Sequence, residues 1–495
     1  MSSELSRREF FKRSGALSVM GAATPWAVNL AAMGEAAAQS TPSDYKALVC
    51  VFLFGGNDYG NTIIPYDQAS YDAYLSIRGG LPATGGLAIA RDAVLASNAM
   101  STKTSTARTP FAGQQFSLTP YVLGTAAPTV NPLLEVFNNE RLAVLFNTGT
   151  LRRPTTKEQY VNRSVPLPPK LFSHNDQQSF WQSSKAEGSV TGWGGRMGDL
   201  FAAGNGTASN FTAISVSGNA VYLAGESAVQ YQVSSSGSIP VNGIKAVNLF
   251  SSNSAGQALR TIMTTPPASA LGSEYASIAS RSISANETMT AALSTSPGNY
   301  AATFDSTNPL MGQLKLVARM IQARGSLNTK RQVFFVSLGG FDTHDTILTG
   351  HPVLQQKVAD ALKYFDATLG EIGARDMVTT FTASDFGRTL TGNGNGSDHG
   401  WGSHHFVMGG MVKGKEFYGK PPNITTKDGA GAYLTKLGTG GPDDVGQGRL
   451  LPSTSVDQLA ATLATWFGVS ATDLNTVLPQ ISEWNVSDRN LGFMR

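Results

Sequence analysis

Short apolar runs recur along the chain, and between them apolar residues return at helical spacing. The runs predict buried strands, and the periodic segments predict amphipathic helices. Alternation of the two is typical of one α/β domain built around a largely parallel sheet. The expected strands are residues 47–54, 142–147, 211–217, 332–338, 377–383 and 406–412, and the clearest helices are 309–324, 353–373 and 456–467.

Two stretches interrupt this alternation. Residues 79–128 and 204–306 are rich in glycine, serine, threonine and alanine, and we expect them to be loop-rich insertions in the same domain. The helix at 353–373 has the opposite character, because its apolar residues line one side and predict a face turned to the core. That face comprises Val353, Val358, Leu362, Phe365 and Leu369.

The N-terminus has the pattern of a twin-arginine export signal. Arg7 and Arg8 precede a mildly apolar stretch, which ends in three alanines at residues 36–38. A membrane anchor is the alternative, but Pro25 and Asn29 interrupt the apolar stretch. We therefore expect residues 1–38 to be a signal peptide recognised by the twin-arginine translocase. Residues 39–495 would then work in the periplasm or outside the cell, without a stable membrane span after cleavage.

Composition narrows the classes of protein. Mean hydropathy is −0.10, which is too polar for a protein with several membrane spans. The net charge of +3 comes without a basic block beyond the leader, so nucleic acid is not an expected partner. Cys50 is the single cysteine, so an intramolecular disulfide and a zinc site built from thiolates are both excluded. It lies in an apolar run, which predicts a buried position in the core.

Carboxylates and imidazoles cluster beside the ends of the predicted strands. Five of the six histidines lie between residues 344 and 405. In open α/β sheets the carboxyl ends of the strands form the ligand-binding edge, and these two donor types together bind divalent cations. Taken one at a time, Asp58 could be a turn residue and His351 a helix cap. The clustered residues are Asp58, Asp342, His344, Asp385, Asp398, His399, His404 and His405.

Ser173 is the best candidate nucleophile. It opens a predicted helix in the segment LFSHNDQQ, next to His174, where backbone N–H groups favour an anion. An ordinary serine N-cap is the alternative, and Thr148 and Thr150 are rival positions. Arg388 is a candidate clamp for a phosphate or sulfate group, as are arginines 152 and 153.

The mature chain resembles the DUF1501 family along nearly its whole length. The matching segments are FLFGGNDYGN, LFSHNDQQSFWQ, SLGGFDTHD, TASDFGRTL and DHGWGSHHFVMGG with VKGKEFYGKPP. That family is similar to a branch of the alkaline phosphatase/sulfatase superfamily. The resemblance implies an alkaline phosphatase-like three-layer α/β sandwich with a mostly parallel sheet, loop-rich insertions and a site for two metal ions.

Several positions of this sequence match the metal-ligand pattern of that superfamily, and two features differ from it. Asp58 matches an early aspartate, Asp342 and His344 a later Asp–His set, Asp385 the aspartate of a pair, and His399 or His404 the final histidine. Phe386 replaces the histidine expected after Asp385, and no nucleophile motif follows the second strand. The candidate metal ligands are therefore Asp58, Asp342, His344, Asp385, His399 and His404.

These patterns predict an exported, metal-dependent hydrolase of phosphate or sulfate esters. Ser173, His174 and Arg388 are its candidate catalytic residues, with two divalent cations that the sequence does not distinguish among Zn, Mn, Mg and Ca. The substrate would be a small or polymeric ester. The alternative is a non-catalytic exported binding protein that keeps the fold, with a structural or lost metal site.

Overall fold

The structure is a computed structural model that describes residues 44–94, 98–120, 130–244, 251–252 and 254–495. The predicted signal peptide, residues 1–38, lies outside these residues. One ten-stranded sheet runs through the molecule in the order β13-β4-β12-β9-β1-β8-β5-β6-β7, with β14 beside β4. The strands are β1 (Lys46–Leu53), β4 (Leu142–Gly149), β5 (Ala213–Ser215), β6 (Tyr231–Ser234), β7 (Gly237–Ser238), β8 (Arg331–Leu338), β9 (Val378–Ser384), β12 (Ser403–Gly409), β13 (Phe417–Gly419) and β14 (Thr454–Ser455).

Parallel pairing dominates the sheet. β1 pairs in parallel with β8 and β9, β5 with β6 and β8, and β4 with β13 and β14. β12 runs antiparallel to both β9 and β4, so β4 points the same way as β9. The carboxyl ends of β1, β8, β9 and β4 therefore share one edge of the sheet.

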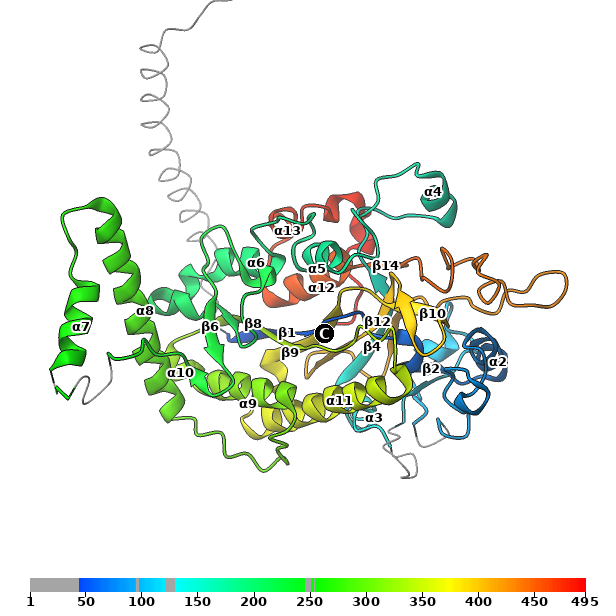
Figure 1. The fold of residues 1–495 in the computed structure, drawn as a ribbon, viewed down its shortest axis with the longest axis horizontal. Helices are drawn as coiled ribbons and strands as arrows, with labels where there is room; N and C mark the ends of the chain where they lie inside the picture. Colours follow the sequence, from blue (N-terminus) through cyan, green and yellow to red (C-terminus); the bar gives the residue numbers. More distant parts are fainter. Residues whose placement is uncertain (1–43, 95–97, 121–129, 245–250, 253) are drawn as a thin grey trace, which may run out of the picture.

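Helices cover both faces of the sheet (Figure 1). One layer contains α3 (Leu133–Asn138), α9 (Pro309–Gln322) and α11 (Ile347–Glu371). The other contains α5 (His174–Ser183), α6 (Trp193–Phe201), α12 (Val456–Phe467) and α13 (Leu474–Val477). β1 shows why both are needed, since Val49 and Val51 enter one core cluster while Cys50 and Phe52 enter the other. Cys50 is thus buried core, as expected.

The predicted mixed α/β architecture is confirmed, with differences at element ends. The helix expected at 456–467 is α12 with both bounds as predicted. α11 begins at Ile347, six residues before the predicted start, because Pro352 is accommodated within the helix. Val353 is 37% exposed and does not belong to the core-facing side. β12 begins and ends three residues earlier than predicted.

The two predicted insertions differ in structure. The described part of residues 79–128 carries β3 (Phe116–Leu118), which pairs with β2 (Ile63–Pro65) beside α2 (Gln68–Ile77). Residues 204–306 supply β5, β6 and β7 to the sheet, and they also form α7 (Ala255–Thr264) and α8 (Ala270–Ser294), which stand out from the body (Figure 1). None of the helices in the described part of the chain combines the length and apolar character that a membrane span requires.

The remaining elements are short. α4 (Lys157–Asn162) and α10 (Arg324–Leu327) lie in connections between the larger elements, and β10 (Arg388–Gly392) pairs antiparallel with β11 (Ser397–His399). This β10–β11 hairpin follows β9 directly and returns the chain toward β12. It therefore places its polar residues at the carboxyl edge of the sheet.

Candidate metal centre

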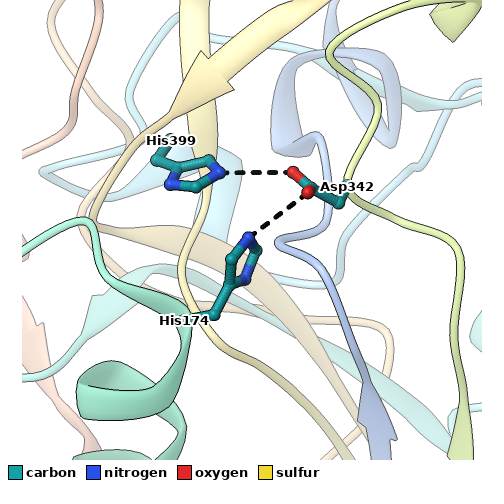
Figure 2. Close-up of side chains that lie close together, drawn as sticks. All are labelled: His174, Asp342 and His399. Carbon is teal, nitrogen blue, oxygen red and sulfur yellow. Dashed lines mark hydrogen bonds and ion pairs between the residues drawn. The ribbon is translucent and has the colours of Figure 1, made fainter.

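Three segments that are distant in the sequence meet at the carboxyl edge of the sheet. The loop after β8 carries Asp342, the first turn of α5 carries His174, and β11 ends in His399. Figure 2 shows both imidazoles turned toward the Asp342 carboxylate. One ligand atom from each of these three residues lies within 4.8 Å of the others, which is close enough for all three to bind one cation.

The Asp342 carboxylate is the centre of the cluster. Its Oδ2 lies 3.4 Å from His174 Nε2, and its Oδ1 lies 3.2 Å from His399 Nε2. His344 joins them, with its Nε2 at 3.1 Å from Asp342 Oδ1 and 2.9 Å from His399 Nε2. Three Nε2 atoms from three different segments therefore face one carboxylate.

Each imidazole uses its other nitrogen to contact an oxygen atom. His174 Nδ1 lies 2.6 Å from Asp385 Oδ2, and His399 Nδ1 lies 2.6 Å from the carbonyl oxygen of Phe172. His344 Nδ1 lies 3.3 Å from Asp398 Oδ1. An oxygen acceptor at Nδ1 keeps the proton there and leaves the Nε2 lone pair free, which is the usual arrangement of histidine ligands to a metal.

The residues around the cluster fix its geometry. The Asp385 side chain is fully buried, and its Oδ2 also accepts a hydrogen bond from Gln178 Nε2 at 2.8 Å. Asp385 Oδ1 has no hydrogen-bond partner among the described residues. The guanidinium of Arg388 is likewise fully buried and donates to Asp342 Oδ1 at 2.6 Å and to the carbonyl of Gly55 at 3.1 Å. Arg388 therefore holds Asp342 in place from beneath the cluster.

The pKa values of the cluster residues are shifted in different directions. The hydrogen bond that His174 donates to Asp385 raises the pKa of His174, against the effect of burial. Burial lowers the pKa of His399. For Asp342, burial acts to raise the pKa, but the hydrogen bond and charge of Arg388 outweigh it and the pKa is lowered. Asp342 is thus ionised and His399 neutral near pH 7.

The structure brings most of the predicted site residues together. Asp342, His344, His399 and Asp385 from the predicted ligand set meet there, with Asp385 behind His174. His174, predicted as catalytic, is one of the three residues whose atoms are close enough together to bind one cation. Arg388, also predicted as catalytic, has its guanidinium occupied by Asp342 and two backbone carbonyls.

Asp58 and His404 lie outside this cluster. The carboxylate of Asp58 forms a fully buried ion pair with Arg78, and it also accepts from the backbone N–H of Gly60. His404 is buried between the rings of Tyr59 and Phe146, and burial lowers its pKa to about 3. Sequence spacing placed both near strand ends, but it did not indicate which way the side chains turn.

Ser173 is the residue before α5 and lies next to His174. Its hydroxyl donates to Asp176 Oδ2 at 2.8 Å, and it makes no side-chain cap on the helix. Of the rival positions, Thr150 donates to Gln177 Oε1 at 2.5 Å and is buried. Ser173 therefore remains the candidate closest in sequence to the cluster.

Sequence reasoning missed three contributors to the site. Asp398 was visible beside His399 but was not selected as a partner for His344. Gln178 is one helical turn after His174, a spacing that places both on the side of α5 that meets Asp385. The carbonyl of Phe172 could not be predicted as a contact of His399, because every residue type has the same backbone carbonyl.

Comparison with solved structures finds distant similarities. A protein named Ps i-CgsB, solved in complex with k-i-k-neocarrahexaose, is 9% identical over 90% of this chain and 77% of that one, with a TM-score of 0.33. The PsFucS1 sulfatase from Pseudoalteromonas sp. is 11% identical over 87% and 74%, with a TM-score of 0.29. A Bacteroides thetaiotaomicron protein described with the metabolism of multiple glycosaminoglycans is 10% identical over 92% and 77%, with a TM-score of 0.33. Similarities at this level carry no argument about activity.

Comparison by sequence gives a family. Among curated proteins no match was found. The family model described as "Protein of unknown function (DUF1501)" matches residues 45–433, which is well over half of the chain and includes every residue of the metal-centre cluster. The chain belongs to the DUF1501 family.

Proposed function

We propose that this protein is an exported hydrolase of phosphate or sulfate esters that depends on a divalent metal ion. The observation that carries the proposal is the convergence of three histidine Nε2 atoms on Asp342, each histidine being held through Nδ1 by an oxygen acceptor. The choice of ester class rests on the resemblance of the motifs to the alkaline phosphatase/sulfatase superfamily. Export rests on the twin-arginine pattern of the leader.

The hydrogen-bonding capacity of the cluster supports a cation. The carbonyl of Phe172 can only accept, so His399 must donate from Nδ1, and neutral His399 then presents a lone pair at Nε2. That lone pair faces both His344 Nε2 and the Asp342 carboxylate. Without a cation, the lone pair of His399 Nε2 depends on a donor at His344 Nε2. A metal ion satisfies all these acceptors with neutral imidazoles.

The charge balance points the same way. A histidine that binds a cation must be neutral, and the carboxylates of Asp342, Asp385 and Asp398 then face one positive side chain in the described part of the chain, that of Arg388. Two negative charges are then uncompensated, which a divalent cation would balance. Imidazole-rich donor sets favour Zn²⁺ or a neighbouring transition metal over Mg²⁺ or Ca²⁺, which prefer oxygen ligands. We propose one such cation at this cluster, since Asp58 and His404 do not face it.

The roles of the chain's own residues follow from their contacts. His174, Asp342 and His399 would hold the cation, with His344 Nε2 beside them; Asp385 would orient His174, and Arg388 would orient Asp342. A bound divalent cation supplies Lewis-acid stabilisation of an ester oxygen and activation of a water molecule. Ser173 would contact or orient the attacking group from the N-terminal end of α5, where backbone N–H groups favour a negatively charged ester.

Ester hydrolysis tests this function. The full chain would be assayed with p-nitrophenyl phosphate and p-nitrophenyl sulfate after loading with Zn²⁺ or Mn²⁺. We expect turnover that Asp342→Ala lowers roughly a hundredfold or more, because it removes the central ligand. Asp345→Ala is the control, since Asp345 is an exposed carboxylate on the same loop. Metal-loaded protein with no turnover of either ester class would contradict the hydrolase and leave the metal-holding binding protein.

A further inference from the structure

A basic pocket lies far from the metal centre, at the other end of the sheet. It is open to solvent and has a volume of about 760 Å³. It is formed at β13 and at the start of β4, where the backbone N–H of Lys415 donates to the carbonyl of Leu142, the first residue of β4. The histidine cluster instead follows the carboxyl ends of β8 and β9, which run parallel to β4. The two sites therefore occupy opposite edges of the sheet.

Most of the charged side chains that line this pocket are cationic. Lys103, Arg108, Lys413 and Arg495 line it together with a single carboxylate, that of Glu416. Lys103 is paired with Glu140 at the rim, and Arg108 lies 4.0 Å from Glu416. Lys413 forms no ion pair with a carboxylate of the described chain, so its full positive charge is available to a ligand in the pocket.

Glu416 acts as a structural anchor beneath the pocket. Its Oε1 accepts from the backbone N–H of Thr104 at 2.9 Å and from its hydroxyl at 2.7 Å. Its Oε2 accepts from the backbone N–H of Ser105 at 2.8 Å and from its hydroxyl. These four donors occupy the carboxylate and fix the loop that carries Lys103 and Arg108. Lys103 thus projects from an ordered segment, residues 103–105, and Arg108 follows three residues after it.

The floor of the pocket is also rigid. Phe111 and Phe417 line the cavity and are at most 2% exposed, and their rings pack against each other at 5.6 Å. The Tyr418 hydroxyl donates to the carbonyl of Lys413 at 3.1 Å, which ties the loop before β13 to the strand. A cavity with fixed walls holds its cations apart without collapse, although like charges in this loop repel one another.

We propose that this pocket is a binding site for a soluble multivalent anion that carries phosphate or sulfate groups. Arginine and lysine are the side chains that bind such groups, arginine through paired N–H donors and lysine as a point charge. One small ion would engage few of the cations around so large a cavity. A ligand with several anionic groups can reach them together, and each additional contact adds to affinity.

Calorimetric titration of the full chain at low salt tests this site. The probes are tripolyphosphate and sucrose octasulfate, which carry the two anion types on unrelated bodies. We expect Arg108→Ala combined with Lys413→Ala to weaken binding at least tenfold. Both side chains are exposed, so the variant is expected to fold. Arg281→Ala combined with Lys436→Ala removes the same charge from exposed positions elsewhere and should leave affinity unchanged.

Three outcomes would overturn the proposal. Unchanged affinity in the pocket variant would place the anion elsewhere, and equal weakening in the control would show attraction to net charge alone. Binding to phosphatidylglycerol vesicles without binding of either soluble probe would assign the surface to a membrane. Asp342→Ala should leave probe binding intact, which separates this site from the metal centre. If one probe binds far more tightly than the other, the anion type of the site is identified.

Discussion

Phe172 adopts a left-handed backbone conformation, with φ of 73°, that a bulky residue rarely occupies. The carbonyl of Phe172 accepts from His399, and its ring lies 5.0 Å from the guanidinium of Arg449. Arg449 in turn donates to the carbonyl of His399 at 3.0 Å. The strain at Phe172 is thus offset by contacts that fix the tautomer of a metal-site histidine, a common use of strained backbone.

Asp385 offers a residue-scale test of how the histidines are oriented. We expect Asp385→Asn to weaken metal affinity about tenfold to a hundredfold, because it removes the charge behind His174 Nδ1 without altering any side chain that faces the cation. Competition with a chromophoric chelator measures this affinity. Asp345→Asn is the matched control. Equal affinity in wild type and Asp385→Asn would show that His174 does not depend on Asp385.

Gly55 gives a second residue-scale test. Its φ is 116°, and a Cβ atom there would lie 2.3 Å from the backbone nitrogen of Asp342. We expect Gly55→Ala to displace the Asp342 loop, lower metal content and cost about 1–3 kcal/mol of stability. Gly339→Ala is the control on the same loop, because a Cβ at Gly339 meets open space. The idea fails if thermal unfolding and metal content are the same in both variants.

The sequence predicted which types of side chain form the site better than it predicted which individual residues belong to it. Asp342, His344, Asp385 and His399 follow or precede strand ends, and the shared edge of the sheet brings them together. Asp58 also follows a strand end, yet its side chain turns to Arg78 from α2's carboxyl end. The spacing of Asp58 and Arg78 in the sequence does not predict this buried ion pair, because the pair forms only when α2 packs beside the strand end.

At the scale of elements, apolar patterning located strands and helices that carry large buried surfaces. α12 and β8 illustrate this, because nearly every position in each is buried. The predicted ends of elements were wrong where polar residues continue the element, as at Ser403 and His404 in β12. There the strand is buried on both faces, so polarity did not mark its start. α11 likewise extends through Pro352, which sequence rules read as a helix start.

The start of α12 provides a pH-dependent prediction. Burial raises the pKa of Asp457 to about 7 against the attraction of Arg196, from an unfolded value near 3.8. The folded state therefore holds a proton that the unfolded state releases, and stability falls as pH rises from about 4 to 7. The full effect is on the order of 4 kcal/mol.

Thermal unfolding of Asp457→Asn between pH 5 and pH 8 measures this effect. The variant removes the ionisation, so its melting temperature should exceed that of wild type by a margin that grows with pH up to about 7. Asp92→Asn, at an exposed carboxylate, should show no such trend. A margin that is constant with pH would mean that Asp457 titrates alike in both states.

At the scale of the whole molecule, the sheet separates two sites of opposite charge preference. Carboxylates and imidazoles gather at the carboxyl ends of β8 and β9, while lysines and arginines gather beside the start of β4. The sites are separate because the loops that follow parallel strands lie at one edge of the sheet and the loops that precede them lie at the opposite edge. A cation at one edge and an anion at the other can therefore bind independently.

The central claim is that the histidine cluster binds a divalent cation in the folded protein. Elemental analysis of metal per chain, on the full chain purified without chelators, tests it most directly. We predict about one equivalent of zinc or another transition metal in wild type and in Asp345→Ala, and its loss in Asp342→Ala. Wild-type protein that binds no divalent metal even after reconstitution, or Asp342→Ala that keeps a full equivalent, would contradict the account.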